Sequence, residues 1–225
     1  MEVVVPFAAT EPKTRLADVL TPAERSTVAR AMLGDVLTAI VETGHEPTVV
    51  ATAPLDLTEV ELPDGVRGST AVTVDDRPLT EAVNARLPAA RTDDSVAVVM
   101  ADLALATPDA LESLLSSDAD VAVAPGRGGG TNALVVSHPD FRVDYHGASY
   151  LDHCEIARDV GASLETIDSF RLGTDVDEPA DLVEVLIHGT EPARTPACLR
   201  ELGFELDRDD GRVDIVRLGD SVRTR

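Results

Sequence analysis

Three aspartates stand where apolar runs of the sequence give way to loops. Asp102 ends the run SVAVVMAD, and Asp175 and Asp177 lie two residues apart in GTDVDEP. In an extended segment, that spacing puts both side chains on the same face. Carboxylates that converge from separate strand ends form the hard oxygen site that Mg²⁺ prefers when it also holds substrate phosphates, so we predict that these aspartates bind Mg²⁺. The alternative for each of them is an ordinary helix N-cap.

Lys13 is the only lysine among the 19 lysine and arginine residues of the chain, and Arg15 follows it in EPKTRL. A compact, mobile ammonium suits a phosphate oxygen better than the planar fork of an arginine does. Both residues follow the apolar run EVVVPF, in the loop after the first predicted strand. We therefore predict that this loop binds phosphate groups through Lys13 and Arg15. The alternative is a surface lysine without a role.

The stretch APGRGGGTNAL (124–134) places three consecutive glycines before Thr131 and Asn132. Glycines adopt positive φ without a steric penalty, so this backbone can approach a ligand closely. Downstream, Ser149 is predicted to open a helix, and the N-terminus of a helix favours an anion. The stretch is either a backbone cradle for a phosphorylated ligand or a mobile loop tip.

Alternating strands and helices must position these residues. The clearest helix begins at the capping residue Thr21, continues through Pro22 and Glu24, and stops at Gly44. Strands separated by helices indicate βαβ units, so the predicted fold class is α/β, with a mixed, mostly parallel sheet between helices. Ligands bind beyond the carboxyl ends of the strands in such a sheet. The predicted strands are 2–7, 48–53, 71–74, 95–102, 120–125, 132–138 and 164–168, and the predicted helices are 21–44, 78–90, 107–117, 149–161 and 178–189.

The net charge of −22 comes from 41 acidic residues that are spread along the chain. Binding to a nucleic-acid backbone needs a basic face, so no nucleic acid is expected as a partner. Dispersed acidity with almost no lysine fits the cytoplasm of a halophilic, salt-accumulating organism. The chain contains no apolar run of roughly 18 residues and no signal-like N-terminus, so we expect a cytoplasmic protein without a membrane span. Cys154 and Cys198 are expected to be reduced, structural thiols.

The character of the sequence changes after Gly189. Residues 1–189 are predicted to form the main domain and residues 190–225 a C-terminal appendage with a short helix and a β-hairpin. Alternating runs flank an Asp-Gly pair in FELDRDDGRVDIVR, which is typical of a hairpin. The hairpin can supply an edge for pairing, so a homodimer stays open as a partner.

Five stretches, taken in order, resemble a known family: VPF…PKTRL, ADLAL, APGRGGGTNAL, YHGASYLDH and LGTDVDEPADL. Together they resemble the 2-phospho-L-lactate guanylyltransferase family of coenzyme F-420 biosynthesis, over residues 1–189. The resemblance implies a nucleotidyltransferase domain with a glycosyltransferase-A-like, Rossmann-like fold. It also implies transfer of a guanylyl group from GTP to 2-phospho-L-lactate, or to phosphoenolpyruvate, with release of pyrophosphate.

The resemblance further implies how the substrates are bound. Lys13 and Arg15 would bind the triphosphate of GTP, with Lys13 and Asp102 as the catalytic residues. The segment DDRPLTEAVN (75–84) is expected to face the purine. The three-carbon phosphoacid would be contacted by Thr131, Gly147 and Ser149, with Gly129, Gly130 and Asn132 beside them. We expect the three histidines His138, His146 and His153 to be structural, because an attacking phosphate that is already ionised gives them no proton to move.

The chain departs from the family pattern in two places. Ala104 stands where relatives commonly have a proline, which alters the stiffness of the loop but leaves Asp102 in place. His146 and Ala148 replace glycines that some relatives carry around Ser149. Many sugar-type nucleotidyltransferases open with a glycine-rich loop, whereas residues 6–22 of this chain contain no glycine. Phosphate binding there is therefore expected to depend on the side chains of Lys13 and Arg15 more than on bare backbone.

Two alternatives share the same fold. One is a nucleotidyltransferase for another phosphorylated acceptor, such as a sugar phosphate or a molybdenum cofactor. The other is a non-catalytic sensor of nucleotides or phosphoacids. Only the guanylyltransferase hypothesis predicts pyrophosphate release that depends on GTP and on a three-carbon phosphoacid.

Overall fold

The computed structural model describes residues 1–90, 94–208, 211 and 213–218. Its centre is a seven-stranded sheet with the order β3-β2-β1-β4-β6-β5-β7, in which β6 runs antiparallel to both of its neighbours. The other strand pairs are parallel, which confirms the predicted mixed, mostly parallel α/β sheet. The strands are β1 (Glu2–Phe7), β2 (Pro47–Ala51), β3 (Ala71–Val74), β4 (Val96–Val99), β5 (Val121–Pro125), β6 (Thr131–Val136) and β7 (Leu164–Thr166).

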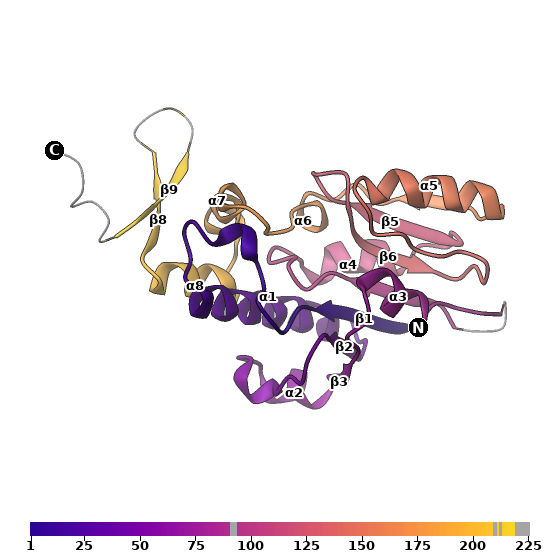
Figure 1. Ribbon diagram of the computed structural model, residues 1–225, viewed down its shortest axis with the longest axis horizontal. Coiled ribbons are helices and arrows are strands. Elements are labelled where there is room, and N and C mark those ends of the chain that lie inside the picture. The colour runs from indigo at the N-terminus through magenta and orange to yellow at the C-terminus, as the bar shows by residue number, and fades with distance from the viewer. Residues whose placement is uncertain (91–93, 209–210, 212, 219–225) are drawn as a thin grey trace.

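The helices flank this sheet, and a separate two-stranded sheet of β8 and β9 lies at the opposite end of the long axis from α5 (Figure 1). Within the described residues, no helix is long and apolar enough to cross a membrane. The helices are α1 (Pro22–Glu42), α2 (Asp64–Gly68), α3 (Leu79–Asn84), α4 (Pro108–Leu115), α5 (Ser149–Val160), α6 (Phe170–Gly173), α7 (Pro179–His188) and α8 (Arg194–Glu201), with 3-10 turns at Thr14–Leu16 and Leu57–Glu59.

Side chains alternate across the sheet, and each face has its own buried cluster. In β1, Val3 and Val5 pack into the cluster that is shared with α1, α4, α7 and α8. Val4 points the other way and packs into the cluster that is shared with α3 and α5. Helices therefore cover both faces, and the strand ends are left as the place where polar side chains can gather.

The long helix α1 begins as its sequence predicts. The Thr21 hydroxyl accepts a hydrogen bond from the Glu24 N–H at 3.3 Å, and the Glu24 carboxylate accepts one from the Thr21 N–H at 2.8 Å. This capping box satisfies two donors of the first turn, while Pro22 occupies a position where no N–H is needed. The helix start is thereby fixed directly after the loop that carries Lys13 and Arg15.

Strands β5 and β6 form a hairpin that turns through the glycine run. Gly129 has φ +83°, and its N–H donates to the Gly126 carbonyl at 3.0 Å. Because β6 runs antiparallel, its first residues lie beside the last residues of β4, and the Met100 N–H donates to the Asn132 carbonyl at 3.0 Å. The hairpin therefore brings Thr131 and Asn132 to the strand end that leads to Asp102.

Some elements differ from the expectations drawn from the sequence. Helix α3 ends at Asn84, not at residue 90, because Pro88 lacks an N–H and disfavours helical geometry in the residue before it. Helices α2 and α6 are short segments that were not predicted. Helices of one or two turns show too little hydrophobic periodicity to be recognised in a sequence.

Residues after the end of α7 form α8 and the hairpin of β8 (Phe204–Asp207) and β9 (Asp214–Arg217). The buried Asp35 carboxylate of α1 accepts hydrogen bonds from the Arg194 N–H at 2.7 Å and from the Thr195 N–H at 2.8 Å. Leu199 and Phe204 belong to the same buried cluster as β1 and α1. The proposed division at residue 189 stays a prediction, and this segment shares its core with the rest of the chain.

Candidate active site

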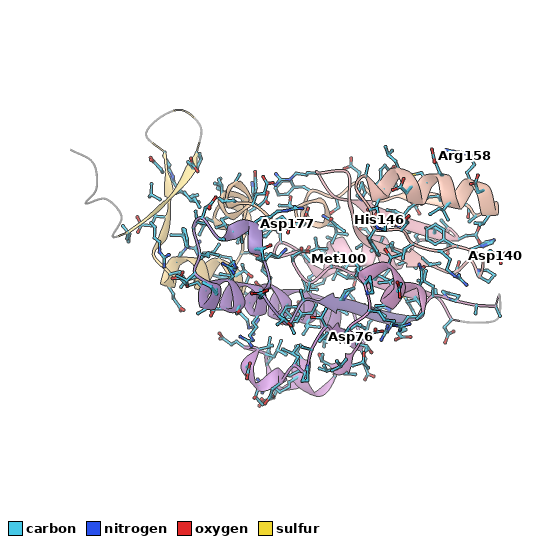
Figure 2. All side chains as sticks on the ribbon, in the orientation of Figure 1. Asp76, Met100, Asp140, His146, Arg158 and Asp177 are labelled. Atoms are coloured by element: carbon cyan, nitrogen blue, oxygen red, sulfur yellow. The ribbon has the colours of Figure 1, made fainter. Side chains whose placement is uncertain are left out.

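A cavity of about 400 Å³ opens at the carboxyl ends of the parallel strands. Met100 and Asp177, both labelled in Figure 2, come from distant segments and both line it. Ligands bind at this edge in open α/β sheets, so the cavity lies where the topology favours a site. One part of its wall is apolar and is made by Val4, Val50, Leu79, Ala82, Val83 and Met100.

Lys13 joins two of the predicted metal ligands. Its ammonium lies 2.6 Å from Asp102 Oδ2 and 2.8 Å from Asp177 Oδ1. Arg15 lies farther out, with a guanidinium nitrogen 3.2 Å from Asp177 Oδ2 and a side chain that is 69% exposed, against 12% for Lys13. The lone lysine is thus an enclosed member of the site, whereas Arg15 lies at its rim.

The backbone that holds Lys13 is unusual. Lys13 has φ 54° and Glu11 has φ 46°, both in the left-handed region that residues other than glycine seldom adopt. The buried Arg25 of α1 fastens this loop, because its Nε donates to the Pro12 carbonyl at 3.2 Å. A loop without glycine is therefore held in a strained form by side-chain contacts, and such strain is concentrated at functional sites.

The charge of Lys13 is set by two opposing effects. Burial alone lowers the pKa of its ammonium, but the charges of Asp102 and Asp177 and their hydrogen bonds outweigh burial and raise this pKa above its ordinary value. Lys13 is consequently a full positive charge at neutral pH, and it serves as an electrostatic group and not as a base.

Asp175 is held by a different partner. The Asn132 amide nitrogen donates to Asp175 Oδ1 at 3.0 Å and to the Leu172 carbonyl at 2.9 Å. Burial raises the pKa of the Asp175 carboxyl, and the like charges of Asp102 and Asp177 raise it further. Gly126 provides the space for this contact, because a Cβ there would lie 2.6 Å from Asn132 Oδ1. Asn132 was predicted to lie beside the phosphoacid residues, and this stays a prediction. Its amide donates one hydrogen to Asp175 and the other to the Leu172 carbonyl, so the side chain orients Asp175.

The surroundings of the Asp102 and Asp177 carboxylates indicate how well they could bind a metal ion. Among the described residues, no three histidine, cysteine, aspartate or glutamate side chains are arranged as a metal-binding group, and the Lys13 ammonium lies between these two carboxylates. Asp102 Oδ1 is buried and has no hydrogen-bond partner in the part of the chain that is described. A buried, unpaired carboxylate oxygen is costly unless a cation or a donor meets it, so the donor set fits a hard divalent ion. The Mg²⁺ assignment stays a prediction.

The predicted phosphoacid residues gather around the start of α5. Thr131 and Ser149 are buried, and the Thr131 hydroxyl lies 2.8 Å from His153 Nδ1. The glycine turn is joined to the same place, because the Tyr150 N–H donates to the Gly129 carbonyl at 3.2 Å. Gly147, with φ 50°, lies just before the helix. These residues form a second group beside the cavity, and in the described chain none of Thr131, Gly147 and Ser149 lines the cavity itself.

Asp75 and Arg77 also line the site. The sequence indicated no individual role for them, and only the segment 75–84 was expected to face the purine. The nearly buried Asp75 carboxylate accepts hydrogen bonds from Arg77 at 2.7 and 2.9 Å and from Arg86 at 2.7 Å. The bonds to Arg77 and then Arg86 hold the pKa of Asp75 well below its usual range. Both Asp75 and Arg77 line the cavity, next to its apolar wall. The signal that could have found Asp75 is the same one that found Asp102, since each follows the carboxyl end of a strand.

Comparison with known proteins shows which family the chain resembles. Residues 1–217 match the family model described as guanylyl transferase CofC like. The chain is 74% identical to the 2-phospho-L-lactate guanylyltransferase of Haloterrigena turkmenica, over 98% of this chain and 99% of that protein. It is 43% identical to the protein of the same name from Methanosphaerula palustris, over 95% and 96% of the two chains.

Solved structures with the same fold are more distant in sequence. A protein from Desulfovibrio desulfuricans assigned to the nucleotide-diphospho-sugar transferases has a TM-score of 0.69 at 19% identity, over 89% of this chain and 95% of that chain. The 4-diphosphocytidyl-2C-methyl-D-erythritol synthase has a TM-score of 0.51 at 13% identity, over 83% and 98%. These similarities confirm the expected nucleotidyltransferase fold.

Proposed function

Because this chain belongs to the guanylyl transferase CofC-like family, we propose that it is a guanylyltransferase that joins GTP to 2-phospho-L-lactate in coenzyme F-420 biosynthesis. An oxygen of the acceptor phosphate attacks the α-phosphorus of GTP. The bond from that phosphorus to the oxygen bridging to the β-phosphate breaks, and pyrophosphate leaves. The acceptor phosphate is already ionised at neutral pH, so no side chain has to remove a proton before the attack.

The observation that carries this proposal is that the Lys13, Asp102 and Asp177 cluster lines a cavity of about 400 Å³ whose wall is apolar in another part. The volume is within the range of small-molecule sites. The apolar wall around Leu79 and Val83 suits a purine face, and the charged cluster suits the phosphates attached to it. We therefore place the nucleoside of GTP against α3 and the triphosphate at Lys13 and Arg15.

Lys13 can bind the triphosphate of GTP while it keeps its contacts with Asp102 and Asp177. An ammonium has three N–H donors, and among the described contacts two of them are used by Asp102 and Asp177. The third remains for a phosphate oxygen. Arg15, which is mostly exposed, adds a second positive charge where the pyrophosphate would leave.

Asp102, Asp175 and Asp177 are the residues that would hold Mg²⁺. When bound, the metal would neutralise charge on the triphosphate and on the departing pyrophosphate. Asn132 contributes by fixing the Asp175 carboxylate, and the hydrogen bond of 3.2 Å from the Val176 N–H to the Asp102 carbonyl ties the segment of Asp175 and Asp177 to the end of β4. The chain thus presents these carboxylates on well-supported backbone.

The acceptor would bind on the other side, at Thr131, Gly147 and Ser149, with the glycine turn at its edge. The buried hydroxyls of Thr131, at the start of β6, and of Ser149, at the N-terminus of α5, would offer hydrogen bonds to a phosphoacid, and the helix terminus favours its negative charge. Holding two polyanions in line for attack is the main task of the protein in this chemistry.

The test is an assay of pyrophosphate release in high salt with GTP, Mg²⁺ and 2-phospho-L-lactate. We expect release that requires the acceptor and stops when the metal is chelated. Phosphoenolpyruvate in place of phospholactate tests the finer choice of acceptor, and a sugar phosphate tests a different acceptor class. Nucleotide binding without any release would support a sensor, and release only with a sugar phosphate would contradict the proposed acceptor.

A further inference from the structure

Both ring nitrogens of His153 are hydrogen-bonded in the interior of the protein. The side chain has 0% exposure. Its Nε2 accepts from the backbone N–H of Asp144 at 3.0 Å, and its Nδ1 lies 2.8 Å from the Thr131 hydroxyl oxygen. The ring therefore links the segment after β6 to the first residue of β6.

These two contacts fix the position of the ring proton. A backbone N–H can only donate, so Nε2 must be the unprotonated nitrogen. In a neutral imidazole, the proton is then on Nδ1, which donates to the Thr131 oxygen. Burial lowers the pKa of His153 to about 4, against the weaker influence of Asp152 and Asp144, so the ring stays neutral at physiological pH.

The direction of this bond determines what Thr131 can do. A hydroxyl has one hydrogen to donate, and a bond accepted from His153 leaves that hydrogen unused. In the described part of the chain, no group is found to accept it. The Thr131 hydroxyl is thus held as a donor, which is the polarity that a phosphate or carboxylate oxygen requires.

Helix α5 connects this arrangement to the other acceptor residue. Ser149, His153 and Ala157 are its buried residues and lie four positions apart, on one face of the helix. The ring of His153 is kept in place by Phe141 and Tyr145, whose ring centroids lie 5.9 and 5.5 Å away. The buried face of α5 therefore carries both Ser149 and His153, and His153 contacts the Thr131 hydroxyl.

From this geometry we infer that His153 is a positioning residue for phosphoacid binding: its Nδ1–H holds the Thr131 hydroxyl so that the hydroxyl donates to an oxygen of the phosphoacid. The inference rests on the proposed function, in which Thr131 contacts the acceptor. It gives a role to a histidine that moves no proton in the reaction.

Two substitutions separate this role from simple packing. The amide nitrogen of Asn is bonded to Cγ, as Nδ1 is, so His153→Asn can still donate to Thr131 but loses the contact to the Asp144 N–H. The amide of Gln is one bond longer, so His153→Gln can accept from that N–H but loses the contact to Thr131. Each variant keeps one hydrogen bond and loses the other. Phe141→Leu removes a ring contact to His153 within the buried cluster but leaves both hydrogen bonds of His153 in place, so it is the packing control.

The measurements are the dissociation constants of phospholactate and of GTP, by calorimetry in high salt. We expect His153→Gln to weaken phospholactate binding about tenfold and His153→Asn to change it about threefold or less, with GTP affinity unaltered in both. In a Thr131→Val background, the Gln substitution should cause no further loss. Equal effects of Asn and Gln, an equal loss of GTP affinity, or an additive loss with Thr131→Val would each overturn the inference.

Two further results distinguish a failure of the proposed acceptor site from a failure of the role inferred for His153. If Thr131→Val alone leaves phospholactate affinity unchanged, the acceptor site of the proposed function has failed, whereas a loss in Thr131→Val without one in His153→Gln rejects only the inference. Nitrogen-15 NMR of the wild-type histidines requires no variant to fold. A proton on Nδ1 of His153 between pH 6 and 8 is expected, and a proton on Nε2 would overturn the assignment.

Discussion

Lys13 and Asp102 are 89 positions apart in the sequence, yet the ammonium of one lies 2.6 Å from a carboxylate oxygen of the other. The first follows β1 and the second follows β4, and these strands are parallel neighbours. The carboxyl ends of parallel neighbours meet at one edge, which brings the two loops together. Asp102 also keeps a buried oxygen unpaired within the described structure. The pair therefore already contains an unsatisfied acceptor, Asp102 Oδ1, which a bound cation would satisfy.

The first prediction concerns Asp177. Asp177→Asn removes a charge that faces Lys13 and Arg15 and weakens a predicted Mg²⁺ ligand, so turnover should fall by about a hundredfold or more. The side chain is 38% exposed, so thermal unfolding in high salt should hardly change. Steady-state kinetics and circular dichroism measure the two quantities. Asp159→Asn, at an exposed position near the end of α5, is the control for loss of charge, and near-normal turnover of Asp177→Asn would remove the metal assignment.

Lys13→Arg tests the need for a compact ammonium. The two short contacts to Asp102 and Asp177 leave little room for a guanidinium, and its planar fork cannot reproduce three tetrahedral donors. We expect the KM for GTP to rise, or kcat to fall, by about tenfold. Arg15→Lys, at the exposed rim, should change either constant about threefold or less. Kinetics of Lys13→Arg that match the wild type would show that a positive charge alone is sufficient.

Several site residues were predictable because strand topology alone brings them together. Lys13, Asp102 and Asp177 follow the ends of strands or an extended segment, and a parallel sheet collects such positions at one edge. The contacts of Asn132 with Asp175 and of His153 with Thr131 were not predictable in this way. They depend on side-chain directions around the antiparallel β6 and on the rotation of α5, which hydrophobic periodicity does not specify.

Gly129→Ala tests the backbone half of the acceptor site. Gly129 has φ +83°, so a Cβ there strains the turn between β5 and β6 that leads to Thr131. Phospholactate affinity should fall by about tenfold, whereas GTP affinity should stay within about twofold. Gly128→Ala is the matched control, because that residue does not have positive φ and a Cβ there would meet nothing within 4 Å. Equal losses for both ligands would mean that the acceptor site lies elsewhere.

Asp35→Ala tests how the C-terminal segment is attached. The carboxylate accepts from the N–H groups of Arg194 and Thr195 and from the Thr195 hydroxyl at 2.6 Å, and it thereby holds the start of α8 against α1. Losing these bonds leaves buried donors unpaired, which should lower the free energy of unfolding by about 2–4 kcal/mol. Asp18→Ala, at an exposed position, controls for the change in net charge. Chemical denaturation in high salt gives the difference, and equal stability of the two variants would contradict this role.

The buried His153 should make stability depend on pH in a defined window. Its pKa is about 4 in the folded protein, below the ordinary value of 6.5. As pH falls from about 6.5 to 4, the unfolded chain takes up a proton that the folded chain does not, so this residue lowers stability by up to about 1.4 kcal/mol per pH unit. Above pH 6.5 its contribution is constant.

The measurement is urea denaturation at pH 7 and at pH 5 for the wild type and for His153→Gln, which cannot titrate in this range. Acidic residues also titrate, so the quantity of interest is the difference between the two proteins, and the wild type should lose about 1–2 kcal/mol more than the variant. His45→Gln changes a histidine outside this buried site and should keep the full wild-type dependence. If wild type and His153→Gln lose the same stability between these pH values, burial does not keep the His153 ring neutral. The direction assigned to the hydrogen bond between His153 and Thr131 then loses its electrostatic support.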